Sequence, residues 1–202
     1  MVNAREIASL HRDLLAEAAR LGFAACGIAP ATEDPLRSAR LEQWLGDGNH
    51  GSMEWMESRL DHRRSPQGLW SEANSVIALG MSYAPAADPL ALAESPDRAR
   101  ISVYAQGKDY HDVVKKALKA LARWLVEQAA QRGLADAGVK VFVDTAPVME
   151  KPLAAKTALG WQGKHTVLVS REFGNWLLLG AVYTTLDLAP DAPETDHCGR
   201  CR

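Results

Sequence analysis

An uncharged run, SVIALGMSY at 75–83, constrains the fold of this chain more than any other stretch. It is rich in small and β-branched residues, a composition typical of a central strand that is covered on both faces of its sheet. Further strands are predicted at 23–29, 101–105, 139–144, 166–170 and 176–185. The run therefore predicts a sheet that is buried between other layers of the protein.

Helices are expected between these strands, because apolar residues recur there every three or four positions. The predicted helices cover 7–21, 34–46, 109–132 and 146–160, and three of them are expected to stop at glycines, namely Gly22, Gly133 and Gly160. Since strands and helices mix along the whole chain, the predicted fold class is α/β (α+β). Helices would pack on a central mixed sheet.

Composition excludes several classes of protein. The chain has 202 residues, 47% of them hydrophobic, which is enough for one full core, and its formal net charge is −2. This charge excludes a broad basic surface, so any contact with nucleic acid is expected to be local. The N-terminus lacks the apolar core of a signal peptide, and no run reaches the ~18 to 20 apolar residues of a membrane span. We expect a soluble, cytoplasmic protein.

Asp144 is the first candidate for chemistry, because it ends an apolar strand and opens a turn. Functional side chains are often exposed at such a place, and a carboxylic acid there could donate a proton. The alternative is that Asp144 or Thr145 only caps the helix expected to begin near Pro147. The residues themselves leave both interpretations open.

Three polar clusters are further candidates, and two of them allow two interpretations each. In GKDYHD (107–112), Asp109 is the expected N-cap, with Tyr110 and His111 as surface residues of the first turn. GWQGKH (160–165) could bind an anion or a flat ligand, or be a β-turn with an exposed lysine. RLDHRRSP (59–66) could hold phosphates or the polar edge of a large cofactor, or be a solvated helix end.

The chain ends with DHCGRCR, after a Pro- and Asp-rich segment at 187–196 that is expected to be a linker. Zinc needs four ligands, and only His197, Cys198 and Cys201 are at hand. An iron–sulfur cluster needs four thiolates, which a Cys-x-x-Cys pair does not supply. The pair therefore indicates an incomplete metal or cluster site.

Several segments together resemble the N-terminal region of the epoxyqueuosine reductases, which are cobalamin and iron–sulfur enzymes of tRNA queuosine synthesis. The matching stretches are YAQGKDYH (104–111), the segment from VFVDTAPVMEKP to HTVLVS (141–170), GNWLLLGAVYTTLDLAPD (174–191) and DHCGRC (196–201). They follow the family's order and span nearly the whole chain. Two departures are His165, where the family usually has Asn, and Asn175, where Ser is usual.

The resemblance implies a cobalamin-binding catalytic domain at 1–186, related in fold to nitroreductases and to the core of reductive dehalogenases. Residues 187–202 would be a linker and the start of a ferredoxin-like module with two 4Fe-4S clusters. The sequence stops after the second cysteine of the first cluster motif, so we expect a truncated motif. The chain alone is then expected neither to ligate a cluster nor to be active.

The resemblance also assigns roles to single residues. Asp144 matches the family's proton donor to the epoxide, which reverses the helix-cap interpretation. Arg63 matches a cobalamin-contacting arginine, and Ser102 lies on the expected strand that borders the corrin. Leu168 and Leu179 match positions whose main-chain groups meet the corrin amides.

Cys198 and Cys201 match the first two cluster thiolates, which would pass electrons to cobalamin. The implied reaction is the two-electron reduction of the epoxide of epoxyqueuosine to the alkene of queuosine at the tRNA wobble position. Expected partners are tRNA bearing epoxyqueuosine, bound largely through regions outside this chain, and an unidentified electron donor, but no membrane. The protein is expected to be a monomer.

Two alternatives from other classes remain. One is a non-catalytic fragment that binds a corrinoid without its iron–sulfur module. The other is a flavin enzyme like the nitroreductases, which kinship of fold alone suggests and no residue of this sequence supports.

Overall fold

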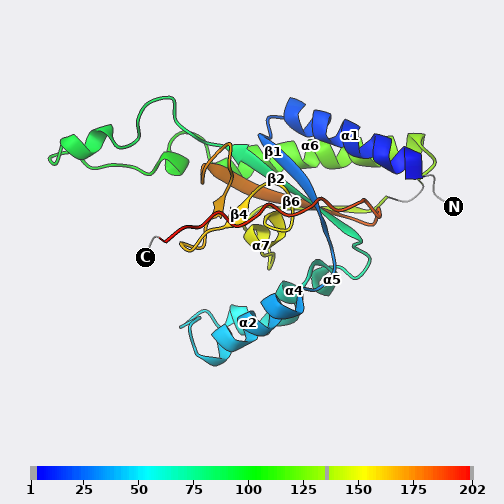
Figure 1. Ribbon diagram of the computed structural model, residues 1–202, viewed down its shortest axis with the longest axis horizontal. Helices are drawn as coiled ribbons and strands as arrows, with labels where there is room; N and C mark the ends of the chain where they lie inside the picture. The colour runs from blue at the N-terminus through cyan, green and yellow to red at the C-terminus, as the bar shows by residue number, and fades with distance from the viewer. Residues whose placement is uncertain (1–3, 135–136, 201–202) are drawn as a thin grey trace.

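A four-stranded antiparallel sheet forms the centre of the protein in a computed structural model, which describes residues 4–134 and 137–200 (Figure 1). The strand order is β1 (Ala25–Pro30), β2 (Ser75–Ser82), β6 (Leu177–Thr184) and β3 (Val139–Phe142). The uncharged run at 75–83 is thus a central strand, as predicted. The α+β class is confirmed, but every pairing of this sheet is antiparallel, so the expected mixed sheet is wrong.

Two long helices, α1 (Ala4–Arg20) and α6 (Tyr110–Gln131), pack on one face of the sheet (Figure 1). Their apolar faces bury Leu14, Leu118 and Leu125 completely, and each such side chain contributes roughly 1.5–3 kcal/mol of hydrophobic stabilisation. Gly180 of β6 lets α6 approach closely, since a Cβ there would lie 2.9 Å from a methyl carbon of Leu118. The main core therefore lies between these helices and the sheet.

The opposite face carries a short helix, α7 (Glu150–Ala154), and a small hairpin of β4 (Trp161–Gln162) and β5 (Leu168–Val169) (Figure 1). The helix expected over 146–160 is therefore much shorter than predicted. Pro147 disfavours helical geometry in the residue before it, and residues 143–149 form an irregular loop instead. This loop carries Asp144.

A helical lobe connects β1 to β2 and lies beyond α7 in Figure 1, on the side away from α1 and α6. It contains α2 (Pro35–Gly46), α3 (Trp55–Ser58), α4 (Leu60–Arg64) and α5 (Pro66–Leu69). Asp34 caps α2 by accepting the Arg37 N–H at 3.2 Å, and Ser65 caps α5 by accepting the Gly68 N–H at 3.0 Å. The basic run at 59–66 thus contains the whole of α4 and the first residue of α5.

The strand predicted at 101–105 is wrong. Residues 83–109 form a loop that extends away from the sheet in Figure 1, with short 3₁₀ turns at η1 (Ala91–Glu94) and η2 (Val103–Ala105). An apolar run becomes a strand only where its backbone groups find a partner strand. In this loop Ile101 and Tyr104 stay exposed instead.

The C-terminal segment contains no helix or strand between 185 and 200, yet it is not free of the body. Leu188 is buried, and its backbone N–H donates to the Ser75 hydroxyl at 2.9 Å. Asp191 bonds Ile28 of β1 twice, through its own N–H at 2.9 Å and through Oδ2 at 2.8 Å. The segment expected to be a linker is therefore docked on the β1 edge, and the boundary at 186/187 stays a prediction.

No helix within the described parts of the chain is both long enough and apolar enough to cross a membrane.

Candidate active site

A cleft of about 380 Å³ opens where the lobe, the 143–149 loop, α7 and strands β5 and β6 meet. Its polar lining residues are Arg63, Tyr110, Asp144, Glu150, Lys151 and Gln162. The remaining walls consist of aliphatic side chains, Met149 and Pro152. The cleft thus combines an apolar surface with a few convergent polar groups, which is typical of a ligand site.

Four residues singled out in the sequence line this cleft together, namely Arg63, Asp144, Leu168 and Leu179. They come from α4, the loop after β3, β5 and β6, so only the tertiary fold brings them together. Ser102 does not join them, because it lies exposed at the start of η2. A strand at 101–105 would have been needed to carry it to the sheet.

Asp144 lies two residues after the end of β3 and has a left-handed backbone, φ 49°, a conformation that Asp tolerates better than most residues. Its side chain is 46% exposed at the cleft. The helix-cap interpretation is wrong, because α7 begins later, with Met149 in the N-cap position and no side-chain cap bond. The turn instead presents the carboxylate to the cleft.

Tyr110 and His111, at the start of α6, both contact the Asp144 carboxylate. The Tyr110 hydroxyl donates to Asp144 Oδ2, and His111 Nε2 lies 3.4 Å from the same oxygen. The two rings are stacked with centroids 4.1 Å apart. Burial and then the Asp144 carboxylate raise the pKa of the Tyr110 hydroxyl, so this group stays protonated as a donor.

Asp109 fixes the orientation of the His111 ring. It is the N-cap of α6, as predicted, and accepts the His111 backbone N–H at 2.9 Å. Its carboxylate also lies 2.8 Å from His111 Nδ1. The cluster GKDYHD was singled out in the sequence, and Tyr110 and His111 do lie part-exposed in the first turn of α6, but their contacts with Asp144 were not expected.

Glu150, at the start of α7, was missed altogether. Its Oε1 accepts the Asp144 backbone N–H at 3.1 Å. Burial, and after it the nearby Asp144 carboxylate, raise the pKa of Glu150 to about 7, although the backbone N–H groups of Glu150 and Asp144 and the charge of Arg63 act in the opposite sense. The available signal was an acid that follows Val148 and Met149, six positions after Asp144, in the segment PVMEKP.

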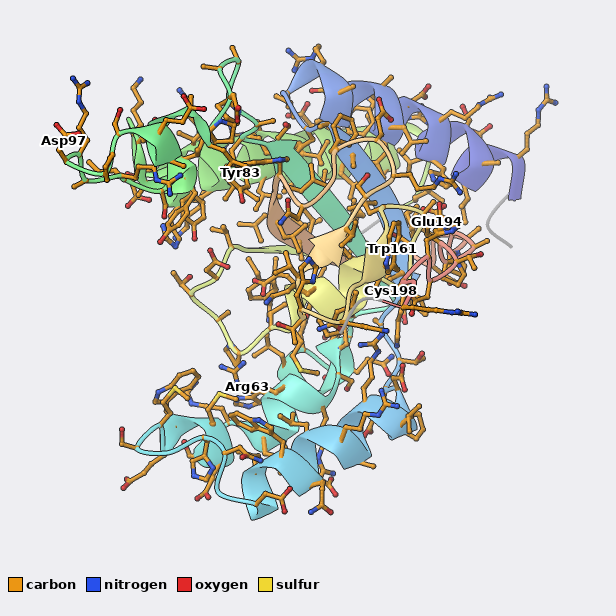
Figure 2. The ribbon with its side chains drawn as sticks, turned by 60° about the vertical axis from the view of Figure 1, so that its left-hand side comes forward. Arg63, Tyr83, Asp97, Trp161, Glu194 and Cys198 are labelled. Carbon is orange, nitrogen blue, oxygen red and sulfur yellow. The ribbon has the colours of Figure 1, made fainter. Side chains whose placement is uncertain are left out.

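Arg63 reaches the cleft from α4, on the lobe (Figure 2). Its guanidinium carbon lies 4.8 Å from the centre of the Trp55 ring, a cation–π contact. Its Nε is buried without a hydrogen-bond partner among the described residues. Burial lowers the pKa of Arg63, although a guanidinium stays charged. The buried N–H is thus a donor that a ligand could satisfy.

The main chain of Leu179 faces the open edge of β6. The Tyr83 backbone N–H donates to the Trp176 carbonyl, and these two residues are opposite each other in the β2–β6 register. In an antiparallel pair every second residue bonds to the same neighbour, so Trp176, Leu178 and Gly180 bond to β2. Leu179 belongs to the other set, which faces the β3 side. Because β3 ends opposite Ala181, it leaves Leu179 beyond its pairing.

Leu168 shows the same pattern in the small hairpin. The Gly163 N–H donates to the Val167 carbonyl, so Gly163 and Val167 form a hydrogen-bonded pair. The next pair, Gln162 and Leu168, is then a non-hydrogen-bonded pair, and its main-chain groups point outward from the hairpin. Leu168 and Leu179 therefore both direct backbone donors and acceptors away from their strand partners. Such groups can bind a ligand whatever the side chain is.

A second hollow, of about 800 Å³, adjoins the C-terminal segment and includes Trp161, His165 and Cys198. Figure 2 shows Trp161 and Cys198 on the same side of the molecule. The indole N–H of Trp161 is buried without a partner among the described residues. Cys201 lies outside the described residues. Within the described ranges, no three His, Cys, Asp or Glu side chains converge in a way that could hold a metal ion.

Comparisons with known proteins point in one direction. Residues 63–145 match the family model described as "Epoxyqueuosine reductase QueG, DUF1730". An epoxyqueuosine reductase of Cellulophaga algicola is 41% identical over 95% of this chain and 60% of its own length, and one of Xanthomonas campestris is 40% identical over 89% and 50%. The chain thus spans about half to three fifths of the length of these curated relatives.

Solved structures show the same fold. An epoxyqueuosine reductase bound to an epoxyqueuosine-modified tRNA-Tyr stem loop superposes with a TM-score of 0.79 at 24% identity, over 96% of this chain and 50% of the other. The Bacillus subtilis enzyme, solved with an aspartate catalytic loop swung out of its active site, gives 0.74 at 22%, over 97% and 50%. The reductive dehalogenase NpRdhA gives 0.50 at 18%, over 93% and 22%.

Proposed function

Its sequence makes this chain a homologue of the epoxyqueuosine reductases, and we propose that it forms the cobalamin-binding catalytic part of such an enzyme. The reaction is the reduction of epoxyqueuosine to queuosine at the tRNA wobble position. One observation carries the proposal: Arg63, Asp144, Leu168 and Leu179, each expected at the cofactor or the epoxide, line a single cleft. The NpRdhA likeness supports the fold only.

The cleft residues fit cobalamin in their chemistry. Cobalamin is a flat macrocycle rimmed with amide groups, so it suits an apolar wall edged with hydrogen-bonding groups. The main-chain groups of Leu168 and Leu179 and the buried N–H of Arg63 would hold those amides. When bound and reduced, the cofactor supplies a nucleophilic, electron-donating cobalt centre for opening an epoxide.

Asp144 is the proposed proton donor. Reduction of an epoxide to an alkene consumes two electrons and two protons and releases one water, and the ring oxygen needs a proton as its C–O bond breaks. Tyr110 and His111 both contact Oδ2 of Asp144. Oδ1 is therefore the oxygen through which Asp144 would serve the substrate, while the two rings fix the carboxyl group.

The loop at 143–149 is proposed to move during the cycle. In the Bacillus subtilis relative an aspartate catalytic loop swings out of the active site. Here the loop carries Asp144 in a left-handed conformation and packs into the cleft through Val148. An outward movement would admit a bulky nucleotide, and a return would bring the carboxyl group to it.

The remaining parts of the reaction lie largely outside this chain. Cys198 and Cys201 are proposed as the first two thiolates of a 4Fe-4S cluster, completed by residues of a following module. That module would deliver electrons from an unidentified donor, and tRNA would bind mostly through further regions. The cytoplasmic location and the monomeric state stay predictions.

A cobalamin titration followed by absorption spectroscopy tests the proposal directly. We expect a saturable spectral change with the wild-type chain, and affinity at least about tenfold weaker for Arg63→Met, since a charged donor is lost. The matched control is Arg40→Met, an exposed residue of α2. No spectral change with the wild-type chain would overturn the proposal, and a yellow chromophore on the purified protein would point to flavin.

Turnover separates the catalytic proposal from its alternative. Full enzyme carrying its clusters, or the chain with a chemical reductant, is assayed on tRNA that contains epoxyqueuosine. Queuosine formation that depends on Asp144 supports the proposal. Cobalamin binding without turnover under both conditions would favour a non-catalytic corrinoid-binding fragment.

A further inference from the structure

We propose that Glu150 is a positioning residue whose carboxylate holds the main chain of Asp144 and so presents the Asp144 carboxyl group to the cleft. The inference deepens the proposed function and rests on the role of Asp144 as proton donor. Glu150 also lines the cleft, but the proposed role is its bond to the Asp144 main chain and not a contact with the cofactor or the epoxide. Its effect would pass entirely through Asp144.

The geometry is that of a closed loop. Glu150 is the first residue of α7, and its Oε1 accepts the Asp144 N–H at 3.1 Å, which ties the two ends of a seven-residue segment together. Asp144 has φ 49°, a left-handed conformation that Asp tolerates better than most residues but that still costs free energy unless its surroundings favour it. The hydrogen bond that Asp144 donates to Glu150 therefore restrains the backbone at this left-handed residue.

Glu150 is itself held in a defined environment. The titratable groups that act on it come from three directions: Asp144 on the loop, Arg63 on α4 and Tyr183 on β6. Tyr183 is buried and Arg63 is half-buried, so Glu150 lies among groups of the lobe, the loop and the sheet.

The charge of Glu150 changes near neutral pH. Its pKa lies at about 7, raised first by burial and then by the Asp144 carboxylate, while the backbone N–H groups of Glu150 and Asp144 and the charge of Arg63 lower it. An ionised carboxylate accepts an N–H more strongly than a protonated one. The restraint on Asp144 is thus strongest above pH 7 and weakens as the pH falls below it.

Nuclear magnetic resonance of the purified, ¹⁵N-labelled chain tests this without any assay of activity. The Asp144 amide proton should titrate with a midpoint near pH 7, because it is bonded to the Glu150 carboxylate. In Glu150→Gln the titration should disappear while the amide stays protected from exchange, since Gln keeps an acceptor oxygen. In Asp144→Asn the midpoint of the residue 144 amide should fall, because the like charge is gone.

Glu150→Leu removes the acceptor while keeping the apolar contacts. We expect the Asp144 amide to exchange at least about tenfold faster and the 143–149 loop to be cut sooner by protease. Glu127→Gln, an exposed acid on α6, is the matched control and should change neither. If Glu150→Leu does not fold, the titration of the Asp144 amide in wild type and its loss in Glu150→Gln still test the proposal.

Kinetics then connect the restraint to catalysis. In the full enzyme, Glu150→Leu should lower kcat about 10- to 100-fold with little change in KM for tRNA, because the proton donor is misplaced rather than lost. Glu150→Gln should keep most of the rate and lose the pH dependence near 7. A merely structural role would leave that pH profile unchanged.

Two results would overturn the proposal: an Asp144 amide that does not titrate in wild type, or one that stays equally protected in Glu150→Leu. Failure of the function proposed above looks different. If cobalamin does not bind but the amide titrates with Glu150, the restraint stands and the catalytic role of Asp144 falls. If cobalamin binds and the amide is indifferent to Glu150, only the restraint falls.

Discussion

The two faces of the central sheet differ in whether apolar or polar side chains determine their packing. On the face covered by α1 and α6, large aliphatic side chains such as Leu14 and Leu118 are completely buried. On the other face, beside α7, a buried Arg63 N–H has no partner among the described residues, and Asp144 is nearly half exposed in a left-handed turn. The first arrangement stabilises the fold, and the second keeps polar groups available for a ligand, as active sites do.

The largest effect is expected from Asp144→Asn, measured as turnover in the full enzyme. Removing a general acid typically costs two to four orders of magnitude in rate, or about 3–5 kcal/mol of transition-state stabilisation. Stability should change little, because Asn also tolerates the left-handed backbone and can accept from Tyr110. Asp112→Asn, on the exposed face of α6, should leave the rate unchanged. Near-wild-type turnover would remove Asp144 from the chemistry.

Leu118→Ala should show the converse behaviour. Leu118 is completely buried against Gly180 of β6, and truncation there should lower the free energy of unfolding by about 2–5 kcal/mol. Urea denaturation measures this loss, with the exposed Val113→Ala on the same helix as the control. Cobalamin affinity of the remaining folded protein should not change. If it falls in parallel with stability, the two faces are not independent.

The same contrast explains how much of the molecule could be predicted from its sequence. Apolar runs predicted β2 and β6, and hydrophobic periodicity predicted α6, because local composition and spacing decide which elements and faces are buried. It failed at Ser102, because the apolar run at 101–105 has no strand to pair with. Pairing is a property of the whole fold, and five residues do not encode it.

The candidate site was predictable only in part. Resemblance to a family suggested Asp144 and Arg63, and both line the cleft. The contacts of Tyr110 and Glu150 with Asp144 were missed, because they join segments through a turn whose backbone angle no propensity predicts. A cluster of polar residues at a helix start, such as GKDYHD, indicates a candidate site, but the residue that it contacts, Asp144, comes from another segment of the chain.

Glu150→Gln should stabilise the protein at alkaline pH. Because burial raises the pKa of Glu150 from 4.5 to about 7, the folded state binds this proton more tightly than the unfolded state does. The group therefore costs nothing below pH 4.5 and destabilises progressively as the pH rises toward 7, by roughly 1–3 kcal/mol once ionised.

Chemical denaturation of wild type and variant at pH 5 and pH 8 measures this difference. Glu150→Gln should be more stable than wild type at pH 8 and close to it at pH 5. An equal difference at both values would mean that Glu150 is not the titrating group. A variant less stable at pH 8 would show that the cleft face contributes to stability as the core face does.

The smallest effect concerns the segment that docks on the β1 edge, which belongs to neither face. Asp191 accepts the Ile28 N–H through Oδ2, and its Oδ1 lies 3.7 Å from His11. Asp191→Asn keeps an acceptor and removes the ion pair, so the loss should be below about 1 kcal/mol and present only where His11 is protonated. Asp191→Ala also removes the acceptor and should lower the free energy of unfolding by about 1–2 kcal/mol.

Urea denaturation measures the stability of both variants, and proteolysis within residues 187–196 reports local release of this segment. If residues 187–196 are a mere linker, neither variant should change stability, and the boundary at 186/187 is then a true domain boundary.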